Sequence, residues 1–142
     1  MRVSEAGIAL IKEFEGVRLE AYLCPAGIWT IGVGSTGPDV VPGLVITEEE
    51  AETRLRRDLR RFERCVTGCV AVPVTQSQFD ALVSLAFNIG CAAFRKSTLV
   101  RKLNDGDDVS AAQEFIRWNR AGGVPLAGLT RRRQSEMELF LS

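Results

Sequence analysis

The region that most constrains how this chain folds is 15–34, where a helical pattern gives way to a hairpin pattern. Before it, apolar residues recur at helical spacing, at Ile8, Ile11 and Phe14. Gly16 is a typical C-terminal breaker, so Glu15 should lie in the last turn of a short helix. The negative end of the helix dipole and an apolar neighbour in Phe14 would disfavour the ionised carboxylate. Glu15 is therefore a candidate general acid.

A β-hairpin is predicted after this helix, with strands at 20–24 and 28–34. Proline near the front and glycine at the back of Pro25-Ala26-Gly27 suit a tight turn between them. Cys24 then stands just before the turn and Thr30 on the returning strand. Glycines share the face of Thr30, and glycine in a strand usually indicates close backbone approach. We expect a flat ligand to lie against this face.

The remaining sequence predicts a mainly helical body. A capping box at Thr47-Glu48-Glu49-Glu50 predicts the start of a long helix over about 48–67. We expect this helix to join a small lobe, at about 15–46, to a helical lobe. The helical lobe consists of about 70–142 together with the N-terminal helix. Later helix starts are predicted at a capping box in 75–78, at Ser97, at Asp107 or Asp108, and at Thr130, with a loop over 121–128. We expect one α+β domain spanning 1–142. Residues 35–46 are rich in glycine, proline and valine and are expected to form a loop with one further short strand.

The chain contains no histidine, which excludes nucleophile triads that use histidine and histidine-containing zinc sites. Its four cysteines lack the paired spacing of a zinc site, and we expect buried, reduced thiols: Cys24, Cys65, Cys69 and Cys91. We therefore expect no metal and no cofactor.

Charge is distributed unevenly along a chain whose formal net charge is zero. Residues 1–52 carry nine acids and three bases, and residues 53–142 carry nine acids and fifteen bases. This asymmetry could set the field across a cleft or favour an anionic polymer. The arginines do not alternate with aromatic residues in the way that is typical of nucleic-acid-binding surfaces, so the sequence does not support nucleic-acid binding. There is no apolar run near the roughly 20 residues of a membrane span and no signal-peptide pattern, so we expect the chain to stay in the cytoplasm until something else releases it.

The spacing of Glu15, Cys24 and Thr30, with eight residues between the first two and five between the last two, resembles that of the phage-type lysozymes of glycoside hydrolase family 24. The resemblance extends over nearly the whole chain, through the blocks 14–22, 29–34, 79–90, 131–133 and 136–141. It implies a lysozyme-like α+β fold. Two residues depart from the family pattern: Cys24 stands where aspartate is usual, and Ser35 where histidine is usual.

By this resemblance, Glu15 protonates the bond between N-acetylmuramic acid and N-acetylglucosamine in peptidoglycan. Water then attacks from the side of Cys24 and Thr30, and the family precedent suggests inversion. Carried over position by position, the resemblance places Thr36, Phe87 and Ser97 along the cleft. Asn88 is a further candidate that the resemblance does not supply. The resemblance also implies a monomer without membrane insertion, which moves from the host cytoplasm to the wall through a hole made by a partner holin.

Three alternatives stay open at this point. The chain is an active muramidase, a wall-binding module with lost or attenuated catalysis, or a lytic transglycosylase that uses Glu15 alone. Cys24 either acts chemically, as a thiolate nucleophile or by orienting water, or is a tolerated small side chain. Trp29 and Trp118 either stack on sugars or belong to the core.

Overall fold

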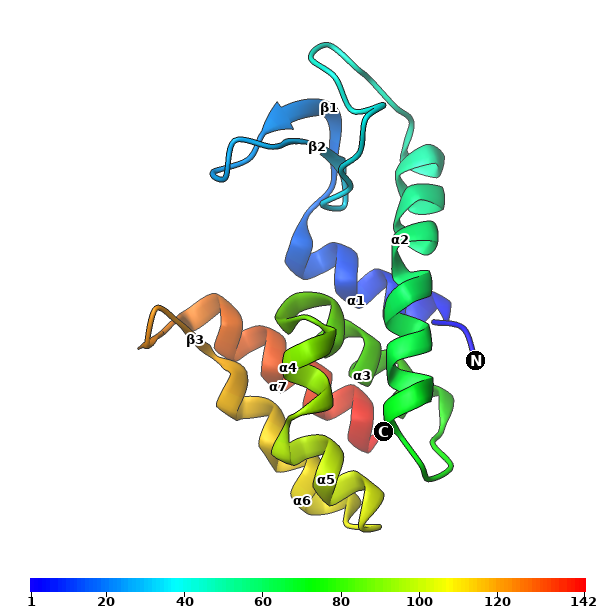
Figure 1. The fold of residues 1–142 in the computed structure, drawn as a ribbon, viewed down its shortest axis with the longest axis vertical. Helices are drawn as coiled ribbons and strands as arrows, with labels where there is room; N and C mark the ends of the chain where they lie inside the picture. Colours follow the sequence, from blue (N-terminus) through cyan, green and yellow to red (C-terminus); the bar gives the residue numbers. More distant parts are fainter. The chain divides into compact units, whose positions relative to one another are not determined.

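The computed structural model describes residues 1–142 and has the predicted α+β composition (Figure 1). The helices are α1 (Glu5–Glu15), α2 (Glu48–Cys69), α3 (Gln76–Ile89), α4 (Cys91–Arg95), α5 (Thr98–Asn104), α6 (Asp108–Gln113), the 3-10 helix η1 (Glu114–Trp118) and α7 (Ala127–Leu141). The strands are β1 (Arg18–Leu23), β2 (Trp29–Gly32), β3 (Arg120–Ala121) and β4 (Val124–Pro125). They form two antiparallel pairs, β1 with β2 and β3 with β4. The chain divides into two compact units, 11–60 and the combination of 1–10 with 61–142.

The predicted hairpin is present in the unit 11–60. Tyr22 pairs with Thr30, and the turn closes through the Gly27 N–H, which donates to the Cys24 carbonyl at 2.8 Å. Strand β1 begins two residues earlier than predicted and ends at Leu23, whereas β2 is shorter than predicted because Gly32 adopts a positive φ of 66° that ends it. Instead of the expected further strand in 35–46, the structure has two isolated bridges, Glu20 with Val45 and Ile31 with Ser35.

Gly32 of β2 packs against the core of this unit, whereas the sequence led us to expect a ligand on its side of the strand. Ile31, Val40, Ile46 and Ala51 pack together, and a Cβ on Gly32 would lie 3.6 Å from the Cα of Ala51. Gly32 therefore serves the close approach of α2, and the prediction that a ligand lies against it is wrong. Gly34 has open space on its side, with nothing within 4 Å of an added Cβ.

Helix α2 begins where the sequence predicts. The Thr47 hydroxyl accepts from the Glu50 N–H at 3.1 Å, as expected of an N-cap. The helix runs to Cys69, two residues past the predicted end. Its first turn is acidic and its later turns are rich in arginine, which complements the helix dipole.

The unit formed by 1–10 and 61–142 is built mainly of helices packed on α3 and α7. Thr75 and Gln78 form the full capping box at the start of α3, and Gly90 ends that helix at a φ of 92°. Phe115 of η1 and Phe140 of α7 contribute an aromatic pair to the core, with ring centroids 5.6 Å apart. The predicted caps at Ser97 and Asp107 are also confirmed.

Two local predictions in this unit are wrong. The 121–128 segment contains the β3–β4 hairpin, because Gly122 and Gly123 both adopt positive φ, as two-residue hairpin turns require. Helix α7 begins at Ala127 and not at Thr130. The Thr130 hydroxyl does not cap the helix; it donates back to the Leu126 carbonyl at 3.1 Å.

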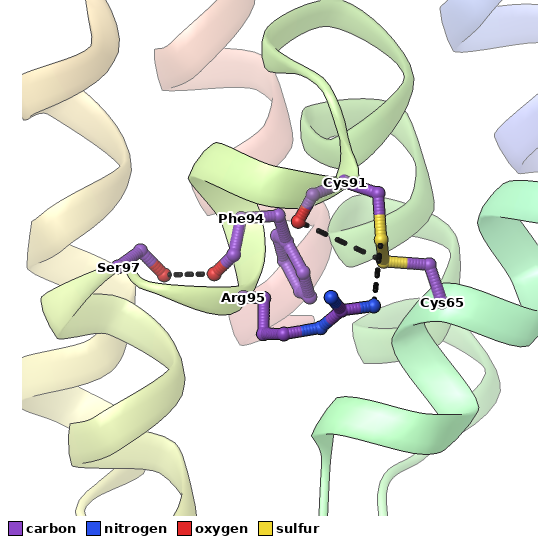
Figure 2. Close-up of a disulfide and its surroundings, with 5 residues drawn as sticks. All are labelled: Cys65, Cys91, Phe94, Arg95 and Ser97. Carbon is purple, nitrogen blue, oxygen red and sulfur yellow. Dashed lines mark hydrogen bonds between the residues drawn. A yellow bond between two sulfur atoms is a disulfide. The ribbon is translucent and has the colours of Figure 1, made fainter.

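The expectation that all cysteines are reduced is wrong for two of them. Cys65 of α2 and Cys91 of α4 form a disulfide, whereas Cys24 and Cys69 are free thiols (Figure 2). The fold brings the two Cα atoms to 6.2 Å, within the range that a disulfide spans. The Arg95 guanidinium donates to the Cys91 sulfur at 3.5 Å. Sequence alone gave no sign of this pairing between residues 26 positions apart.

Removing this disulfide should destabilise the protein. The bond links residues that are 26 positions apart and so restricts the unfolded chain. The chain-entropy model predicts that its removal lowers the free energy of unfolding by about 3.5 kcal/mol. Urea denaturation of the Cys65→Ser/Cys91→Ser double variant measures it. The Cys69→Ser variant is the control, since Cys69 is a free thiol on the same helix. A loss below about 1 kcal/mol would show that the disulfide contributes little.

Candidate active site

Glu15 is the last residue of α1, as predicted, and its side chain is exposed. Gly16 follows with a φ of 79° and donates its N–H to the Lys12 carbonyl at 2.9 Å, which ends the helix. Lys12 in turn binds Glu52 of α2 at 2.9 Å, so the end of α1 is fastened within the unit 11–60. The hydrogen bond from Lys12 also lowers the pKa of Glu52.

The structure brings Cys24 and Thr30 together, as the hairpin predicts. The main influence on the Cys24 thiol is a hydrogen bond from the backbone of Ile28, which lowers its pKa. Partial burial opposes this, and the Ala26 backbone, the Thr30 hydroxyl and the Gly27 backbone add to the lowering. Sequence reasoning found nothing that would lower this pKa, because the donors come from the folded turn.

The Thr30 hydroxyl has two hydrogen-bond partners, the Ile28 carbonyl and the Cys24 sulfur. The side chain is buried, and its hydroxyl donates to the Ile28 carbonyl at 2.9 Å. In that state its oxygen can accept from the Cys24 thiol; when the sulfur is ionised, the hydroxyl can donate to it. The pair can therefore hold a proton or orient a water molecule.

The lowered pKa predicts that Cys24 reacts with iodoacetamide at lower pH than an ordinary thiol. The thiolate is the reactive form, so the pH–rate profile should shift to lower pH than that of N-acetylcysteine amide, which has no charged group. The Cys69→Ser variant isolates the reaction, since Cys24 is then the one free thiol. A profile that coincides with the model compound would contradict the hydrogen-bonding described for the turn.

Thr36 is exposed in the loop that follows β2. Arg54 of α2 binds Asp39 in this loop at 2.5 Å, and that hydrogen bond lowers the pKa of the Asp39 carboxyl. The preceding residue, Ser35, is buried, and its hydroxyl accepts from Arg57 at 3.5 Å. The side chain that replaces the usual histidine thus has a structural partner on α2.

The other three predicted binding residues belong to the helical unit. Phe87 is half-buried and packs edge-on against Phe62, with centroids 5.3 Å apart. The Ser97 hydroxyl accepts from the Val100 N–H at 3.2 Å and donates to the Phe94 carbonyl at 2.7 Å, so it caps α5 (Figure 2). Asn88 is exposed at the end of α3.

Comparison with known proteins decides the family. The phage lysozyme family profile matches residues 12–136. This chain belongs to the phage lysozyme family. An endolysin of Acyrthosiphon pisum secondary endosymbiont phage 1 is 48% identical, over 100% of this chain and 99% of that relative. The predicted resemblance is therefore confirmed.

Solved structures confirm the lysozyme-like fold of this chain. A mutant of P22 lysozyme superposes with a TM-score of 0.96 at 44% identity, over 100% of this chain and 99% of the other. The muramidase domain of SpmX from Asticaccaulis excentricus gives 0.92 at 44% identity, over 99% and 98%. Membership in this family supports a peptidoglycan-lytic function and indicates a peptidoglycan hydrolase. No helix of the chain combines the length and apolar character needed to cross a membrane.

Nothing in the sequence indicated a cavity that lies in the helical unit of this chain. It has a volume of about 230 Å³ and is lined by Thr98, Leu99, Glu114, Arg117 and Trp118. Glu114 is buried and pairs with Lys102 at 3.1 Å and with Arg117 at 2.5 Å. Of these residues, only Trp118 gave a signal in the sequence. A second cavity of about 300 Å³ near Val66 and Phe79 has no charged side chain in its lining.

Proposed function

We propose that this chain is an endolysin that hydrolyses the β-1,4 bond between N-acetylmuramic acid and N-acetylglucosamine, with Glu15 as general acid. The observation that carries the proposal is the arrangement of the unit 11–60. Glu15 ends α1, and the adjoining hairpin holds Cys24 against the Thr30 hydroxyl. Membership in the phage lysozyme family supports the part of the proposal that concerns lysis of peptidoglycan.

In the proposed reaction, the Glu15 carboxyl gives its proton to the glycosidic oxygen as the bond to the muramic carbon breaks. The developing oxocarbenium ion is then attacked by water, whose proton must leave as the new bond forms. Thr30 orients this water through its hydroxyl. The Cys24 sulfur, whose pKa is lowered by its backbone donors, accepts the proton or places negative charge near the sugar ring.

Substrate contacts are proposed for Thr36, Phe87, Asn88 and Ser97. Thr36 offers an exposed hydroxyl, and Phe87 a partly exposed ring. The hydroxyl of Ser97 is already engaged in capping α5, so its contribution would come from its remaining lone pair. The cavity beside Trp118 adds an aromatic side chain and charged groups, a combination that suits a sugar ring with polar substituents.

The replacement of a carboxylate by Cys24 favours one second candidate, a lytic transglycosylase that needs only Glu15. In that reaction the muramic 6-hydroxyl, and not water, attacks the anomeric carbon. A wall-binding module without catalysis is the remaining alternative. For the hydrolase we further propose action as a monomer on glycan strands, after release from the host cytoplasm through a holin.

Mass spectrometry of digested peptidoglycan tests these candidates. Hydrolysis yields reducing muramic acid ends, which sodium borohydride converts to the alcohol with a gain in mass. Transglycosylation yields 1,6-anhydro ends that resist this reduction. We expect reducing ends; anhydro ends would replace the proposal by the transglycosylase, and the absence of soluble products would replace it by the binding module.

A further inference from the structure

A cluster of charged side chains is buried between α3 and α7, within the helical unit. Glu136, Arg132 and Arg133 of α7 are all at most 3% exposed. Glu136 accepts from Arg132 at 3.2 Å and from the Ser84 hydroxyl at 2.5 Å, and its other oxygen lies 3.2 Å from Nε of Arg133. Arg132 also donates to the Ser84 carbonyl at 3.2 Å. The cluster therefore fixes the Arg133 guanidinium through Glu136.

Stability alone is a weak reason for burying these charges. Taking ions out of water costs free energy that their mutual attraction often fails to recover, and apolar residues of similar volume frequently do as well. The cluster also contacts an exposed residue. The buried Arg133 guanidinium donates a hydrogen bond to Oδ1 of Asn88, in the last turn of α3.

This contact determines which end of the Asn88 amide faces outward. Arginine has donors and no acceptor, so the amide atom that it holds must be the carbonyl oxygen. The Asn88 NH₂ group is then the part left for other partners. Because Asn88 is exposed, that group is accessible at the surface of the unit.

We propose that Arg133 is a positioning residue, which holds Asn88 so that its NH₂ donates to an acetamido carbonyl oxygen of the glycan strand. The ligand group follows from the chemistry: a fixed double donor recognises a neutral acceptor, and the N-acetyl carbonyl is a stronger acceptor than the hydroxyl and ether oxygens and is carried by every sugar of this strand. The inference rests on the proposed function, since it takes peptidoglycan as the ligand.

The Asn88→Asp variant separates positioning from stability. An aspartate keeps an oxygen for Arg133 and adds charge to the contact, so the melting temperature should stay unchanged or rise. It removes the NH₂ donors, so affinity for glycan should fall by about 3- to 10-fold, the usual effect of one hydrogen bond. Calorimetry with a soluble peptidoglycan tetrasaccharide measures the affinity, using protein that also carries Glu15→Gln to prevent turnover.

Asn104→Asp is the matched control. The Asn104 amide donates to the Cys69 carbonyl at 2.9 Å and accepts from the Ala71 N–H at 2.8 Å, which ties two segments of the fold together. Losing its donor should lower the melting temperature and leave glycan affinity unchanged. The two asparagines should thus show opposite patterns.

Arg133→Lys tests the positioning role itself. Lysine keeps the positive charge near Glu136 but lacks the planar fork that reaches Glu136 and Asn88 together. Glycan affinity should fall, and adding Asn88→Asp should weaken it little further, because both changes remove the same contact. Unchanged affinity in Asn88→Asp, or fully additive losses in the double variant, would overturn the inference. If wild type binds the tetrasaccharide but yields no reducing ends, the proposed function fails while the test of Asn88 still stands.

Discussion

Glu15→Gln should lose nearly all wall-degrading activity, with a fall in rate of at least about 100-fold. Glutamine has almost the same shape but no acidic proton, so the glycosidic oxygen would leave without protonation. The fold should be unaffected, because Glu15 is exposed at the end of α1. The decrease in turbidity of a cell-wall suspension measures the rate, and circular dichroism verifies the fold.

Glu13→Gln is the control for this prediction. Glu13 is exposed on the same helix two residues earlier, so its substitution makes the same chemical and charge change away from the site. It should retain wild-type activity. Cys24→Asp should also retain much of the activity, since it restores a carboxylate beside Thr30. A Glu15→Gln variant that degrades walls as fast as wild type would show that the acid is another residue.

Glu136→Gln should destabilise the protein by about 3–5 kcal/mol, the usual cost of removing one partner from a buried ion pair. The neutral amide would leave Arg132 and Arg133 buried without the carboxylate that both now contact. It would also change the hydrogen bond with the Ser84 hydroxyl. Urea denaturation measures the loss in the free energy of unfolding.

Glu138→Gln provides the comparison on the same helix. Glu138 is exposed, and surface substitutions of this kind usually change stability by less than about 0.5 kcal/mol. If Glu136→Gln cost no more than Glu138→Gln, the buried cluster would not be the structural anchor of Arg133. The positioning role of Arg133 would then lose its physical basis.

The features predicted correctly from sequence are those that short stretches of chain determine. The turn at 25–27 needs only local backbone preferences, and it places Cys24 beside Thr30. The N-cap at Thr47 and the capping box at Thr75 similarly fix the starts of α2 and α3. The end of α1 at Glu15 follows from one glycine.

The features that sequence reasoning missed depend on contacts between distant segments or on backbone donors in the folded state. The Cys65–Cys91 disulfide requires α2 and α4 to be placed together first. The lowered pKa of Cys24 arises from backbone groups that converge only once the turn has formed. The contact between Arg133 and Asn88 joins residues 45 positions apart, so no local pattern indicates it.

Leaving-group dependence tests the role of Glu15 most directly. A sugar leaving group needs a proton, whereas dinitrophenolate departs without one. A variant that lacks the general acid should therefore cleave the aryl glycoside much faster, relative to wild type, than it cleaves the natural strand. We predict that Glu15→Gln, compared with wild type, loses far less activity on a dinitrophenyl glycoside of the peptidoglycan disaccharide than on the natural strand. Equal losses on the two substrates would contradict proton donation by Glu15.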